Sequence, residues 1–359
     1  MRKLTINQSI EVITELVVRK RKRAFFRGRF GIGKSAAVRA AVAKLNSPEA
    51  MAEMFGPDCP YVGCEMIDIR LGQYDSVDLR GFPHPDKATG TAIWYPPSTM
   101  PFIGNDAFKS NIFYILFLDE FTSASTAVFA VCYQLLLDGC IGEHVLIENC
   151  AICLAGNMDD DKGVVNKIPM PLYNRILQFE MINPKDDFCY YAQSAGVPPE
   201  FVAFWRFKEN LINTYDPKSS ATIVATQRSW FEAVDIWTDG RLSYELKEAA
   251  MVGAIGEGPT VEFMAFTEVW KSLIPIEQII ADPAGVALPT EPSMKYAMAM
   301  HISGNMNPKN IAALHTYLVR MPPEFVVMAW QLATERDKNL FNVPSFIDYM
   351  KRYREVYKN

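Results

Sequence analysis

The 359-residue chain has no long apolar run, no paired-cysteine framework and no excess of positive charge. In its first half the longest purely apolar run extends from Ile112 to Leu118, whereas a membrane-spanning helix needs about 20 apolar residues. The N-terminal segment MRKLTINQSIEVITE lacks the apolar stretch of a signal peptide. The seven cysteines are odd in number and scattered through core-like segments, which suits a reducing compartment. We therefore expect a cytoplasmic protein without a membrane span.

The formal net charge of -5 excludes a protein whose whole surface binds nucleic acid. Local basic patches remain, chiefly RKRKR at Arg19–Arg23 and the terminal MKRYREVYK. The first patch falls at the expected C-terminal end of a helix, where cations complement the helix dipole, so we favour a structural role for it. The length and the hydrophobic share of 49% indicate a globular protein with more than one packed unit.

What the sequence does contain is a phosphate-binding loop in the stretch FFRGRFGIGKSAAVRA. In this pattern backbone N–H groups surround a polyphosphate, the lysine reaches its outer phosphates and the hydroxyl holds Mg²⁺. An apolar strand precedes the loop and an alanine-rich helix follows it, which is the order that the motif requires. The predicted nucleotide-binding residues are Gly28, Arg29, Phe30, Gly31, Ile32, Gly33, Lys34 and Ser35.

The first half of the chain predicts a parallel α/β sheet, because short apolar runs alternate with helical patterns. The expected strands lie in AFFRG, YVGCEMIDIRL, NIFYILFLDE and NCAICLAGN, and a helix closed by Asp138-Gly139 lies between the last two. After Asn183-Pro184 the apolar residues recur three and four apart, which indicates helices, one of them starting at Asn307-Pro308. We predict an α/β nucleotide-binding domain over residues 1–184, a helical domain over 185–275 and a helical extension over 276–359.

The strand NIFYILFLDE supplies the acidic groups that nucleotide hydrolysis needs. It delivers Asp119 and Glu120 to its C-terminal end, where ligands bind in open α/β sheets. Asp119 is predicted to support Mg²⁺ and Glu120 to orient and deprotonate the attacking water. The next strand ends in Asn157, whose amide could hold a γ-phosphate or the attacking water, or could serve turn chemistry.

Three further features have competing interpretations. Cys150 and Cys153 have the spacing of a zinc pair but no second pair, so core packing is favoured. The run Asp159–Asp161 is interpreted as a solvated turn rather than a cation site. The segment 81–102, rich in proline and glycine, is predicted to be a long surface excursion that contacts a client protein or packs on its own core.

These motifs together resemble, in order and spacing, the AAA+ ATPases of the MoxR type. The resemblance covers about residues 5 to 240 and rests on GRFGIGKS, FLDE, LAGN, DDDKGVVNKIPMPLYNRI and TQRSW, with DLRG before the proline-rich excursion. It implies an AAA+ P-loop NTPase core, a parallel sheet flanked by helices, followed by an all-helical lid. Two departures are visible, since the family usually has proline at the positions of Arg29 and Phe30 and aspartate at that of Asn174.

The resemblance also implies roles and partners. Asn157 would be sensor 1, Arg175 the arginine finger that reaches a neighbouring subunit, and Arg228 sensor 2 on the lid. From the residues alone, Arg175 could instead pair with a carboxylate, and Arg228 could cap a helix or form an ion pair. The family acts as a homo-oligomeric, hexameric ring with ATP and Mg²⁺, and often matures a protein client together with a von Willebrand A domain protein.

Four functions are compatible with these motifs to different degrees. The leading hypothesis is an ATPase ring with chaperone-like activity, and ATP is preferred because the chain has no Asn-Lys-x-Asp element of guanine-specific proteins. A nucleic-acid motor or loader is the first alternative, and a nucleotide-gated scaffold with little turnover is the second. A small-molecule kinase is weaker, because it does not need the water-activating pair Asp119 and Glu120.

Overall fold

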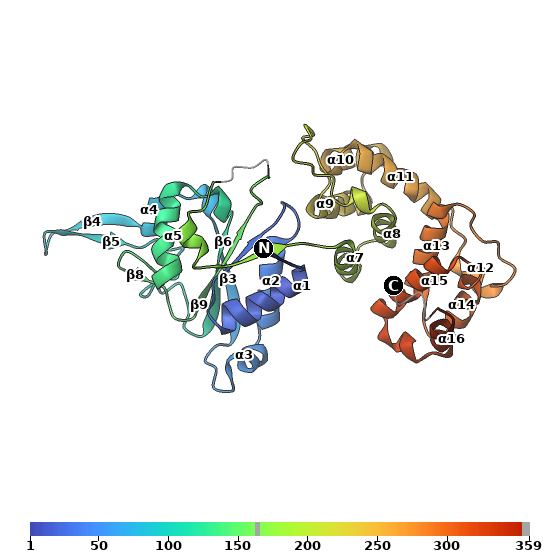
Figure 1. The fold of residues 1–359 in the computed structure, drawn as a ribbon, viewed down its shortest axis with the longest axis horizontal. Coiled ribbons are helices and arrows are strands. Elements are labelled where there is room, and N and C mark those ends of the chain that lie inside the picture. Colours follow the sequence, from blue (N-terminus) through green and yellow to red (C-terminus); the bar gives the residue numbers. More distant parts are fainter. Residues whose placement is uncertain (162–165, 354–359) are drawn as a thin grey trace. The chain divides into compact units, whose positions relative to one another are not determined.

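The computed structural model describes residues 1–161 and 166–353. The chain forms two units, Met1–Pro184 with Asp216–Ser219, and Lys185–Tyr215 with Ser220–Asn359 (Figure 1). Two sequence features lie partly outside the described residues. These are residues 162–165 of the motif DDDKGVVNKIPMPLYNRI and residues 354–358 of the terminal MKRYREVYK.

The first unit is built on a six-stranded parallel sheet in the order β1-β10-β2-β9-β6-β3. Its strands are β1 (Arg2–Leu4), β2 (Ala24–Arg27), β3 (Gly63–Arg70), β6 (Ile112–Asp119), β9 (Cys150–Gly156) and β10 (Leu177–Met181). The four strands expected from the sequence are all present. The edge strand β1 and its neighbour β10 were not expected, because neither shows a long apolar run.

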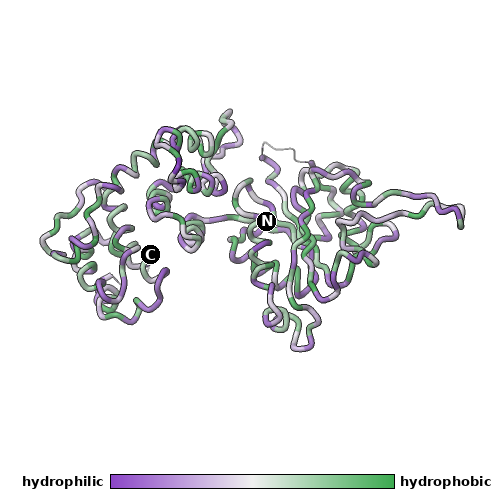
Figure 2. Tube along the Cα trace, turned by 180° about the vertical axis from the view of Figure 1, so that it is seen from behind, coloured by the Kyte–Doolittle hydropathy of each residue, from purple (hydrophilic) through white to green (hydrophobic). Residues whose placement is uncertain are grey.

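Helices cover both faces of this sheet, as neighbouring side chains of one strand demonstrate. Phe25 packs in a core cluster with α5, while Phe26 packs in a second cluster with η1 and α2. Burial on both faces explains why β6 and β9 are apolar over most of their length. Figure 2 shows hydrophobic stretches of chain running through this unit. The helical segments of this unit are α1 (Ile6–Val12), the π-helix η1 (Ile13–Arg19), α2 (Lys34–Leu45), α3 (Pro48–Phe55), η2 (Leu71–Gln73), α4 (Ser76–Arg80), η3 (Phe121–Ser123), α5 (Thr126–Asp138) and α6 (Met170–Tyr173). The α/β core predicted from the sequence is confirmed.

The proline-rich excursion is a β-hairpin rather than an irregular loop. Strands β4 (Phe82–Asp86) and β5 (Thr91–Tyr95) pair antiparallel and project from the first unit (Figure 1). Gly81 precedes the hairpin at φ +83°, and a β-carbon there would overlap the carbonyl oxygen of Tyr95. The close approach of the two chains at this point therefore requires glycine. A short second hairpin, β7 (Cys140–Ile141) with β8 (His144–Val145), follows α5.

The second unit is helical in its described residues, as the periodicity predicted. Its helical segments are α7 (Lys185–Ser194), α8 (Pro199–Phe207), η4 (Glu209–Leu211), α9 (Gln227–Thr238), α10 (Tyr244–Ile255), α11 (Glu257–Lys271), α12 (Ile276–Ala281), α13 (Pro292–Asn305), α14 (Ile311–Leu318), α15 (Pro323–Arg336), η5 (Lys338–Asn342) and α16 (Pro344–Tyr353). Two apolar clusters hold them together, one around Trp205 and Trp230 and the other around Trp330 and Tyr349. Along the described part of the chain, no helix is both long enough and apolar enough to cross a bilayer.

One expected helix start is wrong. The sequence pattern placed it at Asn307-Pro308, but α14 begins at Ile311. The side chain of Asn307 accepts N–H bonds from Lys309 and Asn310 at 2.9 and 3.3 Å. Asn307 therefore stabilises a turn that leads into the helix, because a short amide side chain bonds nearby backbone groups equally well in both settings.

Candidate nucleotide site

The glycine-rich loop connects the fully buried strand β2 to helix α2, in the predicted order of strand, loop and helix. Gly33 is the N-cap of α2 and lies in the left-handed region at φ +100°, a conformation that glycine adopts without steric cost. The sharp turn brings the N-terminus of α2 next to the loop. This is the local geometry of a phosphate-binding site.

Lys34 is held by backbone and side-chain oxygens at the loop. Its Nζ donates to the carbonyl oxygens of Gly28 at 2.7 Å and Arg29 at 3.0 Å. It also donates to Oδ1 of Asn157 at 3.0 Å. The predicted phosphate-binding lysine and the predicted sensor at the tip of β9 are thus in direct contact, although 123 residues separate them.

Ser35 contacts the acidic strand. Its Oγ donates to Oδ2 of Asp119 at 2.9 Å. A hydroxyl and one carboxylate are oxygen ligands of the type that Mg²⁺ prefers, and Mg²⁺ usually takes its other ligands from water and phosphate. The pair therefore fits the predicted metal position. Within residues 1–161 and 166–353, no cluster of three or more His, Cys, Asp or Glu side chains could hold a metal by itself.

Glu120 follows directly after β6 in an unusual backbone conformation. Its φ of +54° lies in the left-handed region, which is uncommon for residues other than glycine. The other carboxylate oxygen of Asp119, Oδ1, accepts the Glu120 backbone N–H at 2.8 Å and helps to hold this turn. Strained backbone of this kind is found preferentially at functional sites.

Asp159 and Asp160 lie in an exposed turn, as expected, but the carboxylates of Asp159–Asp161 also form ion pairs with Arg27 at the end of β2 and Arg29 in the loop. Arg27, which is only 7% exposed, forms an ion pair with Asp159. Arg29 donates a bidentate pair of hydrogen bonds to the Asp160 carboxylate at 2.6 and 2.7 Å and another hydrogen bond to Asp161 at 2.6 Å. The hydrogen bond from Arg29 lowers the pKa of Asp160, and the two carboxylates raise the pKa of Arg29. These pairs fasten the segment after β9 to the phosphate-binding loop.

Buried polar groups that the sequence did not reveal support the end of β9. Thr122 is fully buried, and its Oγ1 accepts the backbone N–H of Asn157 at 3.0 Å. Asn166 donates its backbone N–H to the carbonyl of Thr122 at 2.7 Å and its side-chain amide to that of Ala124 at 2.9 Å. A single threonine or asparagine carries no periodic signal, and only the strand order brings these residues together.

Arg175 lies between α6 and β10, partly exposed. It donates to the carbonyl of Pro171 at 3.0 Å and its guanidinium lies 5.7 Å from the ring centre of Tyr133. Neither of these two contacts of Arg175 is with a carboxylate.

Arg228 belongs to the second unit, where it lies exposed in the first turn of α9. The helix is capped by Thr226, whose side chain accepts the N–H of Ser229 at 3.1 Å, so Arg228 is not the cap. A cation in the first turn opposes the helix dipole, which favours negative charge at that end. The position gives no evident benefit to the helix itself.

The basic run Arg19–Arg23 is largely engaged within the first unit. Arg19 pairs with Glu15, four residues earlier. Arg21 lies 4.2 Å from the ring centre of Phe113 and donates to the carbonyl of Cys150 at 3.1 Å. The expected structural role at a helix end agrees with these contacts.

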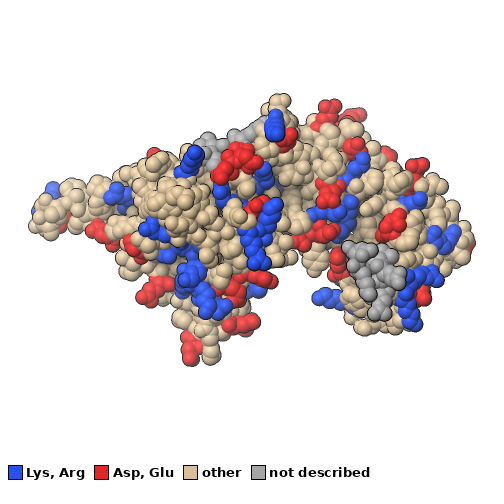
Figure 3. Space-filling model, in the orientation of Figure 1, with Lys and Arg blue, Asp and Glu red and all other residues tan. Residues whose placement is uncertain are grey.

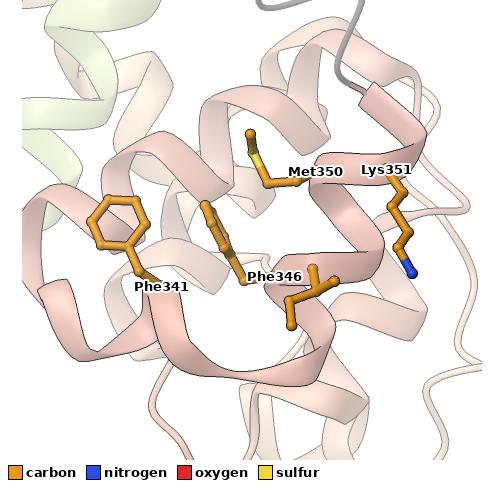
Figure 4. A pocket seen from close by; sticks show the side chains of 5 residues that line it. Phe341, Phe346, Met350 and Lys351 are labelled. Atoms are coloured by element: carbon orange, nitrogen blue, oxygen red, sulfur yellow. The ribbon is translucent and has the colours of Figure 1, made fainter.

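A pocket in the second unit offers no comparable chemistry. Its lining is Phe341, Phe346, Ile347, Met350 and Lys351 from η5 and α16 (Figure 4). These residues supply an apolar surface with a single cation at its rim. The groups suited to phosphate chemistry gather instead at the carboxyl ends of β2, β6 and β9 in the first unit.

Comparisons with known proteins add similarities of overall chain trace. No protein-family model matches the chain, and no curated protein matches it in sequence. NtrX from Brucella abortus in complex with ADP is similar at 14% identity and a TM-score of 0.38, over 98% of this chain and 67% of that one. An ATPase candidate from Cytophaga hutchinsonii is similar at 10% identity and a TM-score of 0.32, over 92% and 83% of the two chains. Hsp104 with ATPγS and FITC casein is similar at 13% identity and a TM-score of 0.31, over 73% and 48%.

Proposed function

We propose that this chain is an AAA+ ATPase of the MoxR type, which hydrolyses ATP to ADP and phosphate. The observation that carries the proposal is the meeting of three strand ends. Lys34 from the loop contacts Asn157 from β9, and Ser35 contacts Asp119 from β6. Few other activities need a phosphate-binding loop, a carboxylate pair and an amide at one edge of a sheet.

In the proposed mechanism each of these side chains has a defined task. The ammonium of Lys34 stabilises the negative charge of the outer phosphates, and backbone N–H groups of the loop bind them. Ser35 and Asp119 would hold Mg²⁺, which neutralises phosphate charge when it is bound. Glu120 removes a proton from water as the water oxygen attacks the γ-phosphorus and the bond to ADP breaks. Asn157 orients that water or the γ-phosphate.

The proposed assembly is a homo-oligomeric ring, hexameric by the resemblance, in which Arg175 reaches a neighbour's nucleotide. Arg175 suits this task because its side chain is partly exposed and rests on a backbone carbonyl and an aromatic ring. Arg228 is proposed to contact phosphate from the helical lid over residues 185–275, where a cation in the first turn of α9 is otherwise unfavourable. The remaining helices, 276–359, are proposed to form the C-terminal extension.

The proposed test is ATP hydrolysis per subunit as the protein concentration rises through the micromolar range. A steep rise is expected, because the active site is completed between subunits. Glu120→Gln should abolish turnover but retain ATP binding. Equal turnover by wild type and Glu120→Gln would contradict the proposal and favour the nucleotide-gated scaffold.

The β4–β5 hairpin is the proposed client-contacting surface. Cross-strand partners Phe82 and Tyr95 are 64% and 60% exposed, and Ile93 on the same face is 44% exposed. On the opposite face Trp94 is partly buried, and Arg80 lies 5.2 Å from its ring centre. The hairpin surface is mostly uncharged in Figure 3. An apolar face of this kind suits an unfolded or partly folded protein, and a von Willebrand A domain protein is a proposed partner by resemblance only.

Replacing both Phe82 and Tyr95 by serine should abolish stimulation of the ATPase by reduced, carboxymethylated α-lactalbumin. Basal hydrolysis should persist, because neither side chain contacts the nucleotide site. Lys87→Ser at the hairpin tip is the matched control and should leave stimulation intact. Unchanged stimulation in the double variant would contradict this role.

The nucleic-acid motor is less favoured, because Arg19, Arg21 and Arg23 make contacts within the first unit. Stimulation of the ATPase by DNA, together with binding that weakens steeply with salt, would revive it.

A further inference from the structure

Gly72 lies against the carboxylate of Glu120. It is the middle residue of the turn η2, which follows β3 and packs beside η3. A β-carbon built on Gly72 would lie 2.7 Å from Oε2 of Glu120 and 3.3 Å from Cβ of Ser123. Both distances are shorter than ordinary van der Waals contact. The Glu120 carboxylate therefore occupies space that exists only because residue 72 has no side chain.

The backbone of η2 does not itself require glycine. Gly72 lies in a 3-10 turn, a conformation that other amino acids adopt readily. This contrasts with Gly33, whose left-handed conformation favours glycine for its own sake. What Gly72 supplies is space, and the closest group that uses this space is the Glu120 carboxylate.

We propose that Gly72 is a positioning residue for hydrolysis, which sets where the Glu120 carboxylate lies. This inference rests on the proposed function, in which Glu120 activates water. The backbone of Glu120 is fixed by its left-handed turn and by the bond from its N–H to Asp119. An added methyl group at residue 72 must therefore displace the flexible end of the Glu120 side chain, and it also requires Cβ of Ser123 to shift by a few tenths of an ångström.

Gly72→Ala should cost little folding stability but much activity, because a flexible carboxylate moves more easily than packed backbone. A displacement of about 1 Å can lower turnover by about a hundredfold. We expect kcat to fall at least tenfold, while the Kd for ATP stays within about twofold, since the methyl group does not touch the phosphate-binding loop.

The decisive experiment compares Gly72→Ala in wild type with Gly72→Ala in a Glu120→Asp background. The shorter aspartate withdraws from the added methyl group, so the expected loss from Gly72→Ala in that background is less than twofold. Gly253→Ala is the control, because a β-carbon there would have no neighbour within 4 Å. Thermal unfolding of all variants checks that the folds are intact.

The inference is overturned if Gly72→Ala turns over ATP at the wild-type rate, or if it lowers turnover equally in both backgrounds. A parallel loss of ATP binding or folding would also overturn it, because the effect would then be structural. Full turnover by Glu120→Gln would instead contradict the proposed function itself. The two failures are thus distinguishable.

Discussion

Removing one buried hydroxyl, that of Thr122, is expected to loosen the end of β9 that carries Asn157. Thr122→Val preserves the shape of the side chain but removes the oxygen that accepts the Asn157 N–H at 3.0 Å. Thr122 is 0% exposed, so water cannot easily replace the lost acceptor. Leaving such a donor unpaired costs about 1 to 3 kcal/mol.

If Asn157 acts as proposed, the same free energy should be added to the activation barrier for ATP hydrolysis, since Asn157 also contacts Lys34. Each 1.4 kcal/mol is worth about a factor of 10 in rate, so we expect kcat to fall by about 5-fold to 150-fold. Hydrogen exchange of a peptide spanning residues 150–161 measures the loosening, and steady-state ATPase measures the loss of turnover.

Thr122→Ser is the matched control, because it keeps the acceptor and loses only a methyl group. It should retain most of the exchange protection and most of the activity. Wild-type protection and turnover in Thr122→Val would show that this hydrogen bond supports neither β9 nor Asn157.

Three further predictions concern the metal, the ion pairs and the thiols. Ser35→Ala should weaken ATP binding at least tenfold in Mg²⁺ and far less in EDTA by calorimetry, and equal losses would contradict a Mg²⁺ role. Arg29 lowers the pKa of Asp160, so this pair stabilises the fold above the ordinary carboxyl pKa near 4 and loses that effect as the pH falls through the lowered pKa. In Asp160→Asn the free energy of unfolding should therefore depend less on pH below about pH 4. Burial raises the pKa of Cys64 and Cys132 to about 12, so both thiols should resist iodoacetamide at pH 8 until the protein unfolds, as read by mass spectrometry.

The sequence predicted the parts of the first unit that depend on local pattern. The central strands, the loop from Gly28 to Ser35 and the end of α5 at Asp138-Gly139 each have a strong apolar or turn signal. Edge strand β1 has no such signal, because it is three residues long and largely exposed. Its position is set by pairing with β10, which no local pattern encodes.

Some residues of the candidate site could likewise be predicted from local sequence patterns, and others could not. Lys34, Ser35, Asp119 and Asn157 follow from motif and strand order. The contacts of Asp159–Asp161 with Arg27 and Arg29 could not be predicted, because the sequence of an acidic run does not show whether its carboxylates are solvated or form ion pairs. The proposed role of Gly72 could not be predicted from the sequence either, since it depends on a side chain 48 positions later in the chain.

We propose that ATP is hydrolysed at a site shared between two copies of the chain. Mixing two inactive variants, Glu120→Gln and Arg175→Ala, tests it most directly. In a mixed ring, a subunit with intact Glu120 can receive Arg175 from its Glu120→Gln neighbour, so we expect ATPase activity that neither variant shows alone. Mixtures that exchange subunits and yet stay inactive at every ratio would contradict the claim, as would full activity of Arg175→Ala by itself.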